Sequence, residues 1–402
     1  MDVNIQRKID RRVGVSICRL LSLFYRNKKK EAGSKKPERI LVLLLSEMGS
    51  LVLAHPMFQR IRSKYPRASI HVLLFEKNRE VLDLLAVVPP ENILTINDRS
   101  MLRFAGDTIG VLKKMRELNF DTVIDCELFA RISSIISYFS GASIRVGFHA
   151  HTMEGLYRGS FINRPVLYSP YHAIPDQFVG LVEAIDSDAM PKNKFLVEDV
   201  KREAPRARIG HAEILEMKKR LYSDYPDIQG KRLVLLYPSG GILPIRAWPP
   251  LYFAKLAESL INRGYGVGII GLEEAKGPAS VILSRCGASA CVDLTGYTKS
   301  IRELVILFRA ASLLIANDGG PAQFAALAPI ERILFYGPET PTLYGPLDGG
   351  AHVFYRRTSC SPCLTAYNHR RSPCDGDNVC LKSIHPEEVL EKALSILSEP
   401  RA

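Results

Sequence analysis

The chain has 402 residues, 47% of them hydrophobic and 24% charged, so it is long enough for two globular domains. No run of about 18 uninterrupted apolar residues occurs, which argues against a membrane-spanning helix. The formal net charge is +12, but +8 of it falls within residues 1–40, where twelve Lys and Arg residues outnumber four acids. The rest of the chain is only mildly basic, which argues against general binding of nucleic acid.

Residues 1–36 form a basic segment with helical periodicity. Apolar residues recur every three or four positions, which predicts a helix with one apolar stripe and cationic flanks: Ile5, Ile9, Val13, Ile17, Leu20, Leu21 and Phe24. Such a helix can lie in an anionic membrane surface, with the three lysines of residues 28–30 as an anchor. A solvated tail and a helix packed on the protein itself are the open alternatives. Arg19 interrupts the stripe and no cleavage site follows, so we expect no secretory signal and a cytoplasmic location, peripheral on the inner face of the cytoplasmic membrane.

Strand-like and helix-like segments then alternate from residue 37 to residue 190. The apolar runs predict strands at 40–45, 70–74, 93–96, 122–126 and 144–146, and a helix over 51–65. Periodicity weakens over 191–230, where charged and Pro-containing stretches indicate an interdomain region. A second alternating set fills 231–402, with strands at 233–237, 265–270, 313–316 and 332–335, and helices near 248–262, 301–311, 321–328 and 386–397. This order predicts an α/β protein with two Rossmann-like doubly wound domains that face each other across a cleft.

The segment from residue 317 to 327 is the most informative in the chain. It follows an apolar strand and reads Asn-Asp-Gly-Gly-Pro before a helix-like stretch, so Asp318, Gly319, Gly320 and Pro321 lie at a strand-to-helix turn. Glycines followed by Pro at a first helical position leave backbone N–H groups at a helix N-terminus, which suits an anion. An ordinary strand–helix turn is the alternative.

Three further motifs accompany this segment in a fixed order. Residues 40–56 read ILVLLLSEMGSLVLAHP, residues 235–241 read LLYPSGG and continue to Arg246 and Trp248, and residues 293–296 read DLTG. Together they resemble glycosyltransferase family nine, the heptosyltransferase-like group with the two-domain GT-B fold. The resemblance covers roughly residues 38–400, and the order of the motifs over some 300 residues carries it.

The resemblance implies inverting transfer of a sugar from a nucleotide-sugar donor to a lipid-linked saccharide, typically a lipopolysaccharide core. The donor would bind the second domain and the acceptor the first. The diphosphate would be held by backbone donors near Ser239 and Gly240, by the turn at 318–321 and by the cation of Arg246. Glu273 or Glu274, after a predicted strand, would bind the ribose hydroxyls, with a solvated carboxylate in the first turn of a helix as the alternative. No Asp-x-Asp pair lies beside the phosphate loops, so no divalent metal is expected for catalysis.

Two positions depart from the family pattern. Ser50 stands where the family has an Asp that is thought to act as general base, and a serine hydroxyl cannot accept the proton unaided. Glu47, three residues earlier, is the nearest carboxylate, so we predict that Glu47 is the base; a base elsewhere is the alternative. Gln323 stands where the family commonly has His. Both departures leave open a catalytically silent homologue that acts as a scaffold in envelope-glycan assembly, and a nucleotide-sugar epimerase is a third possibility.

Four of the eight cysteines cluster with the spacing C-x2-C-x10-C-x5-C, namely Cys360, Cys363, Cys374 and Cys380. Two close pairs around a loop predict a structural zinc or iron site, with free thiols or disulfides as alternatives. The resemblance supports a metal, because cysteine fingers occur in part of the family, including iron-binding members. The other cysteines are scattered and are expected to pack as small apolar residues: Cys18, Cys126, Cys286 and Cys291.

Overall fold

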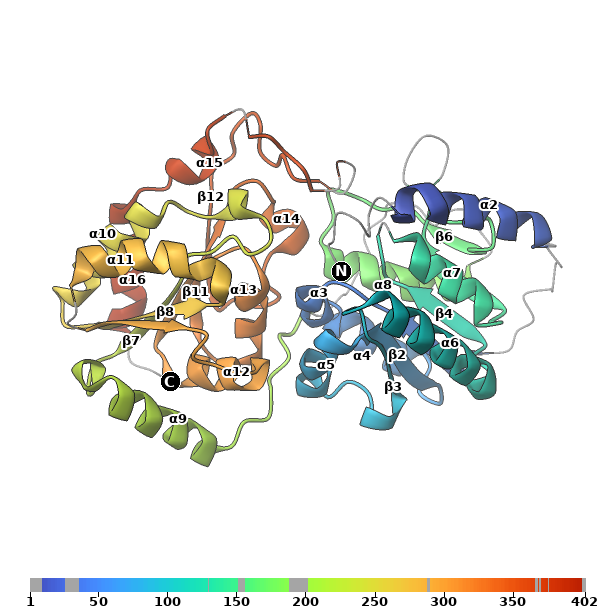
Figure 1. Ribbon diagram of the computed structural model, residues 1–402, viewed down its shortest axis with the longest axis horizontal. Coiled ribbons are helices and arrows are strands. Elements are labelled where there is room, and N and C mark those ends of the chain that lie inside the picture. Colours follow the sequence, from blue (N-terminus) through green and yellow to red (C-terminus); the bar gives the residue numbers. More distant parts are fainter. Residues whose placement is uncertain are drawn as a thin grey trace. The chain divides into compact units, whose positions relative to one another are not determined.

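The structure is a computed structural model that describes residues 9–25, 36–128, 130–150, 156–187, 202–287, 290–365, 368, 370–374 and 376–399. The chain divides into two compact units, Met1–Arg202 (unit 1) and Glu203–Ala402 (unit 2). Each unit contains one six-stranded sheet (Figure 1). Within the described ranges, no helix is both long and apolar enough to cross a bilayer.

The sheet of unit 1 is parallel throughout, with strand order β3-β2-β1-β4-β5-β6. Its strands are β1 (Arg39–Leu43), β2 (Ser69–Phe75), β3 (Ile93–Ile96), β4 (Thr122–Asp125), β5 (Ile144–Phe148) and β6 (Arg164–Val166). The strand order reverses between β1 and β4, and ligands of such sheets bind beyond the carboxyl ends of the strands at this switch point.

Helices cover both faces of this sheet, which explains why β1 is apolar and buried after its first residue, the exposed Arg39. The helices are α3 (Met48–Leu53), α4 (His55–Lys64), α5 (Arg79–Leu85), α6 (Met101–Leu118), α7 (Arg131–Phe139) and α8 (Ile174–Glu183). Val111 and Met115 of α6 share a core with Ile136 of α7, so these two helices cover the same face. Helix α4 packs against α8, and α3 packs against α5.

The amphipathic N-terminal segment is helical where the structure describes it. A π-helical turn (Asp10–Gly14) leads into α2 (Val15–Phe24), which packs against α7. Cys18 is fully buried with Phe161 and Ile162. Residues 9–25 therefore pack against the protein itself, one of the alternatives that the sequence left open. The lysines of residues 28–30 lie outside the described residues.

Unit 2 repeats the same topology, with strand order β12-β11-β10-β7-β8-β9 and a switch point between β7 and β10. The parallel strands are β7 (Leu233–Tyr237), β8 (Gly266–Gly271), β9 (Cys291–Thr295), β10 (Leu313–Asn317), β11 (Glu331–Tyr336) and β12 (Ala351–Tyr355). The helices are α9 (His211–Asp224), α10 (Pro250–Ile261), α11 (Lys276–Cys286), α12 (Ile301–Ala310), α13 (Gly320–Phe324), α14 (Pro341–Tyr344), α15 (Val379–Lys382) and α16 (Pro386–Ser398).

Two features of unit 2 differ from the sequence expectation. The region expected to be interdomain contains α9, which packs against α12 inside unit 2. The helix expected over 321–328 is short, because α13 has five residues and continues only as a 3-10 turn (Ala325–Leu327). Its dipole is correspondingly small, so backbone amides at this turn would act mainly as individual hydrogen-bond donors.

Candidate active site

The switch point of unit 1 brings together the two residues that the sequence assigned to proton transfer. Glu47 is the N-cap residue of α3, and Ser50 lies one turn later in the same helix. The Ser50 hydroxyl donates a 2.6 Å hydrogen bond to the Glu47 carboxylate. Ser50 is only 5% exposed, so we assign its hydroxyl to orienting Glu47. A carboxylate oriented in this way can accept a proton from a hydroxyl placed within hydrogen-bond distance.

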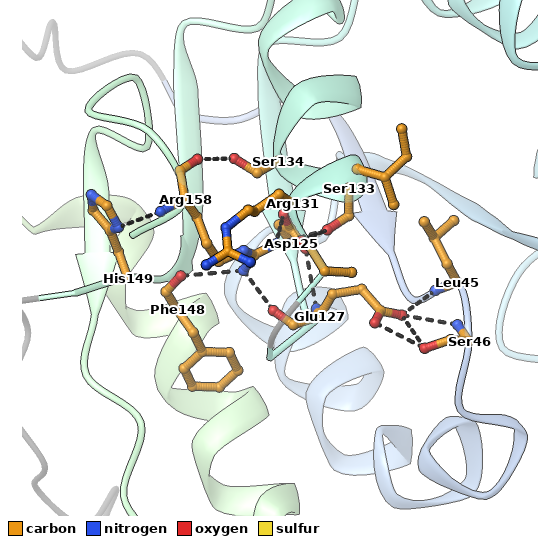
Figure 2. A network of polar contacts seen from close by, with 12 residues as sticks. Leu45, Ser46, Asp125, Glu127, Arg131, Ser133, Ser134, Phe148, His149 and Arg158 are labelled. Atoms are coloured by element: carbon orange, nitrogen blue, oxygen red, sulfur yellow. Dashed lines mark hydrogen bonds and ion pairs between the residues drawn. The ribbon is translucent and has the colours of Figure 1, made fainter. Parts of the chain in front are cut away.

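A second carboxylate, Glu127, lies at the same switch point and was missed in the sequence analysis. It follows β4 by two residues, and its side chain points to the loop after β1 (Figure 2). Its Oε1 atom accepts hydrogen bonds from the backbone N–H of Leu45 (2.7 Å) and of Ser46 (2.9 Å), and the Ser46 hydroxyl donates to both carboxylate oxygens. Glu127 thus fixes the backbone that leads directly into Glu47.

Burial dominates the titration of Glu127. It raises the pKa of this carboxyl to about 7, with a smaller upward contribution from the charges of Glu47 and Asp125. The hydrogen bonds from Ser46 act in the opposite direction, because they favour the charged form. Glu127 therefore changes charge near neutral pH, whereas an ordinary glutamate is already fully ionised there.

A buried ion pair supports the strand end that carries Glu127. The guanidinium of Arg158 pairs with Asp125, and neither side chain is exposed (Figure 2). Arg158 also donates to the Glu127 carbonyl oxygen (2.5 Å) and to the Ser133 hydroxyl (2.7 Å). Burial raises the pKa of Asp125, and the positive charge of Arg158 opposes that rise. Removing one partner would leave a buried charge without compensation, so this pair holds the loop in one conformation.

The switch point of unit 2 is held together by Asn317, the last residue of β10. Asn317 is fully buried, and its side chain accepts a 2.8 Å hydrogen bond from the Trp248 backbone N–H. Its amide group donates to the Ser239 carbonyl oxygen at 3.1 Å. One side chain therefore ties the loop after β7, which includes the predicted donor residues Ser239 and Gly240, to the end of β10.

Arg246 belongs to the same loop after β7 and contacts Asp318, the residue that follows β10. Its guanidinium contacts the Asp318 carboxylate at 3.3 Å and donates to the Gly240 carbonyl oxygen at 3.2 Å. Among the described residues, the buried Nε–H of Arg246 has no hydrogen-bond partner. Such a buried donor is uncommon in folded proteins, and an anionic ligand would satisfy it. Arg246 thus combines a positive charge with a spare donor at the carboxyl ends of β7 and β10.

Gly240 cannot carry a side chain here. A Cβ atom at this position would lie 2.5 Å from the Leu243 carbonyl oxygen, which is far inside van der Waals contact. The next residue, Gly241, has a φ angle of +62°, which favours glycine, and its N–H is bound by the Ser239 hydroxyl at 2.9 Å. The tight turn keeps the backbone of this loop bare near Arg246.

Three other residues predicted to bind the donor, Gln323, Glu273 and Glu274, differ in their exposure and partners. Gln323 is 7% exposed and donates a 2.8 Å hydrogen bond to the Tyr344 carbonyl oxygen, so its amide already has a partner within the fold. Glu273 is 85% exposed and pairs with Lys276. Burial raises the pKa of the Tyr237 hydroxyl, and the negative charges of Glu274 and Asp318 add to this rise while Ser239 and the positive charge of Arg246 oppose it. Of the two glutamates that the sequence offered for the ribose, Glu274 is therefore the one electrostatically linked to the switch point.

The four clustered cysteines line one cavity of about 200 Å³. Burial and the neighbouring thiols Cys363, Cys360 and Cys374 raise the pKa of Cys380 to about 11. The backbone N–H of Asn378 donates to the Cys374 sulfur at 3.1 Å. Within the described ranges, however, no three His, Cys, Asp or Glu side chains converge closely enough to hold a metal ion. The thiols surround a common space without closing on one point.

A larger cavity of about 500 Å³ adjoins the loop after β7 (the donor loop, residues 238–249). It is lined by residues 243–245 of that loop and by residues from the cysteine-rich segment, including Arg370 and Arg371. Arg370 pairs with Glu339 at 3.3 Å and lies over the Tyr344 ring. The cysteine-rich segment therefore forms one wall of a basic pocket beside Arg246 and Gly240.

The fold matches that of solved glycosyltransferases of the GT-B class. The structure of Escherichia coli ADP-heptose LPS heptosyltransferase II superimposes with a TM-score of 0.69 at 21% sequence identity, over 89% of this chain and 98% of that chain. A dodecameric iron-containing glycosyltransferase, TibC of enterotoxigenic E. coli, superimposes with a TM-score of 0.52 at 13% identity, over 91% and 80% of the two chains.

The sequence comparisons give the family. The model of glycosyltransferase family 9 (heptosyltransferase) matches residues 109–371, and the chain belongs to this family. Lipopolysaccharide heptosyltransferase 2 of Salmonella typhimurium is 25% identical over 373 residues, which covers 90% of this chain and 99% of the relative. The E. coli K12 protein of the same name is 22% identical, over 90% of this chain and the whole of the relative. The protein is therefore a glycosyltransferase, as the motifs predicted.

Proposed function

We propose that this glycosyltransferase transfers a heptose from an ADP-activated donor to a lipid-linked saccharide of the lipopolysaccharide type, with inversion at the anomeric carbon. The names of its relatives support the donor and the class of acceptor. The observation that carries the proposal is the donor corner of unit 2, where the buried Nε–H of Arg246 has no partner among the described residues and lies beside the bare Gly240 turn.

Unit 2 would hold the diphosphate of the donor. As the anomeric C–O bond breaks, the bonding electron pair leaves with ADP, and the charge on the leaving phosphate grows. Arg246 would stabilise that charge, together with backbone N–H groups near Ser239 and at the Gly319-Gly320 turn. Glu274 is the better candidate for the ribose, because Glu273 pairs with Lys276 at the surface.

Unit 1 would supply the proton acceptor. The acceptor hydroxyl oxygen forms the new bond to the anomeric carbon, and its proton passes to the Glu47 carboxylate. Ser50 orients Glu47 through the 2.6 Å hydrogen bond. Glu127 acts as a positioning residue, since it fixes the Leu45–Ser46 backbone that precedes Glu47.

The Glu47→Gln variant tests this assignment. The amide cannot accept the proton, so kcat should fall by about 10²- to 10⁴-fold while the dissociation constant for ADP-heptose stays unchanged. Product formation on a lipopolysaccharide acceptor is measured by mass spectrometry, and donor binding by calorimetry. Glu91→Gln, on a 3-10 turn of unit 1, is the matched control and should retain full activity. Full turnover in Glu47→Gln would remove Glu47 as the base, and donor binding without product in the unaltered protein would favour a silent homologue.

We also infer that the cysteine-rich segment binds one structural zinc or iron ion. All four thiols line one cavity, an amide already donates to the Cys374 sulfur, and a solved family neighbour is iron-containing. The ion would cross-link the segment and take no part in the transfer itself. Elemental analysis of the purified protein should find about one ion per chain, and Cys363→Ser/Cys374→Ser should lose it, whereas Cys286→Ser should not. Metal-free protein with four freely titrating thiols in the segment would contradict the inference.

The acceptor implies a place of action at the anionic inner face of the cytoplasmic membrane. Residues 1–36, with their excess of cations, are the expected contact.

A further inference from the structure

Exposed apolar side chains are concentrated on two helices of unit 1. Among the described residues, fifteen large hydrophobic residues are exposed, and nine of them belong to α6 or to α2 and the turn before it: Ile9, Val13, Ile17, Leu20, Leu23, Phe24, Met101, Leu102 and Ile109. Surface apolar residues scattered singly need no explanation, but a concentration of this kind marks a binding surface.

The orientation of α2 is fixed by its opposite side. Asp10 accepts hydrogen bonds from the first amides of α7, and the Ser22 hydroxyl bonds the Tyr157 hydroxyl at 2.9 Å. Cys18 is fully buried against the body of the unit. Consequently Leu23 and Phe24, which are 82% and 71% exposed, are held away from the protein.

Helix α6 belongs to the same layer as α2. It shares the core on one face of the sheet with α7, and α7 in turn contacts α2. Figure 1 shows α2, α7 and α6 in succession on unit 1. The side chains of Leu102 and Ile109 are 89% and 70% exposed, so they lie on the side of α6 turned away from the sheet.

Both helices carry cations around these apolar side chains. Arg12 and Arg19 of the N-terminal segment are exposed. Helix α6 carries four exposed cations against two acids, namely Arg103, Lys113, Lys114 and Arg116 against Asp107 and Glu117. An apolar surface among cations matches an anionic lipid bilayer, whose headgroups pair with the cations while its acyl chains accept the apolar side chains.

We propose that the outer surface of the α2–α7–α6 layer (the docking face) binds an anionic lipid bilayer. The proposal goes beyond the N-terminal segment, since it makes α6 a second contact, and it rests on the proposed function for its purpose. Docking through a folded layer would hold unit 1, which carries Glu47, in a fixed orientation to the membrane in which a lipid-linked acceptor is embedded.

The test uses the full-length protein with vesicles and without donor or acceptor sugar. The unaltered protein should sediment with vesicles that contain phosphatidylglycerol, much less with pure phosphatidylcholine, and less at high salt. Leu23→Ser/Phe24→Ser and Leu102→Ser/Ile109→Ser should each weaken binding by on the order of tenfold. Ile242→Ser/Leu272→Ser, at positions of unit 2 that are 79% and 64% exposed, is the matched control and should bind as the unaltered protein does.

Three results would overturn the proposal: no binding of the unaltered protein to anionic vesicles, an equal loss in the unit 2 control, or full binding by Leu102→Ser/Ile109→Ser. Light scattering tests whether a second copy of the chain covers the docking face instead. If the unaltered protein is a dimer and Leu23→Ser/Phe24→Ser is a monomer that still binds vesicles, the face is a subunit interface and the proposal is wrong. The vesicle measurements do not depend on sugar transfer, so an inactive enzyme would not change their results. The docking variants should still bind ADP-heptose, since their side chains lie outside the donor corner.

Discussion

Glu127 is a carboxylate of the candidate site whose pKa burial raises to near neutral pH. Its buried carboxylate accepts two backbone hydrogen bonds from the loop that leads to Glu47, and burial raises its pKa to about 7. The groups that face it are Glu47, Asp125 and, beyond Asp125, Arg158. Below pH 7 the protonated form is a weaker acceptor, so the loop should be held less firmly there.

The Glu127→Gln variant should separate this charge from mere packing. In the unaltered protein we expect kcat to rise with pH through an apparent pKa near 7. The glutamine variant should lose that limb and show a lower, flatter profile, with donor affinity unchanged. Glu127→Asp, which retains the charge, should restore a limb near neutral pH. A profile in Glu127→Gln that keeps the same limb would show that another group, such as Glu47, produces it.

The raised pKa of Glu127 also affects how the free energy of unfolding changes with pH. The sign of this change is opposite to that for a salt-bridged carboxylate, whose pKa is lowered. Between the ordinary pKa of about 4.5 and the folded value of about 7, the folded state binds a proton that the unfolded state has lost. The free energy of unfolding contributed by Glu127 therefore falls as pH rises through this window. Urea unfolding at several pH values should show this slope in the unaltered protein relative to Glu127→Gln.

A sequence signal for Glu127 did exist. Asp125 and Glu127 form an Asp-x-Glu pair directly after a buried strand, where side chains of a parallel sheet reach the ligand edge. What the sequence could not supply was the pairing of β4 with β1, which brings Glu127 to the loop of Ser46. The Glu47–Ser50 contact could be predicted from the sequence, because the two residues are three positions apart where a strand leads into a helix.

At the scale of elements, Asp10 provides a cap for a helix that begins 121 residues later in the chain. Its carboxylate accepts hydrogen bonds from the amides of Arg131 (2.7 Å) and Ile132 (3.2 Å), and pairs with the Arg131 guanidinium at 3.1 Å. A cap of this kind contributes about 0.5–2 kcal/mol.

Asp10→Ala should therefore lower the free energy of unfolding of unit 1 by about 1 kcal/mol. Asp10→Asn keeps an acceptor oxygen for the amides and should lose less. Chemical denaturation measures both variants, and Glu117→Ala, at a surface ion pair with Lys114, serves as a control that should change little. Equal stability of Asp10→Ala and the unaltered protein would mean that this cap contributes nothing to the stability of unit 1.

The three strands that the sequence analysis missed all lie at sheet edges, although β3, the fourth edge strand, was predicted. Strands β6, β9 and β12 lie at sheet edges, where one side lacks a neighbour. Asp293 within β9 is exposed, and most of β12 is only half-buried, so neither forms the continuous apolar run that identified the central strands. By contrast, β7 is buried throughout and has the bounds that its sequence predicted, Leu233–Tyr237. For β9 and β12, incomplete burial therefore explains why no continuous apolar run identified the strand.

At the scale of the whole molecule, each unit has its own parallel sheet and hydrophobic core, so the two units need not unfold in one transition. The residues predicted to bind the nucleotide-sugar donor all belong to unit 2, whereas the proposed proton acceptor, Glu47, belongs to unit 1. A ligand that binds only the native state raises stability by an amount set by its concentration relative to its dissociation constant.

ADP should therefore stabilise unit 2 selectively. At about 100 times its dissociation constant, ADP adds about 2.7 kcal/mol, which for a domain of this size raises the melting temperature by about 5–10 °C. Hydrogen-exchange mass spectrometry should find the protection within residues 203–402. Arg246→Ala should lose most of the ADP-induced shift at the same concentration, because a charged hydrogen bond contributes about 1.5–3 kcal/mol. Arg263→Ala, which removes an exposed cation of unit 2, should keep the full shift. An undiminished shift in Arg246→Ala would remove Arg246 from the donor site. Protection confined to residues 9–187 would place the nucleotide in unit 1 and contradict the proposal.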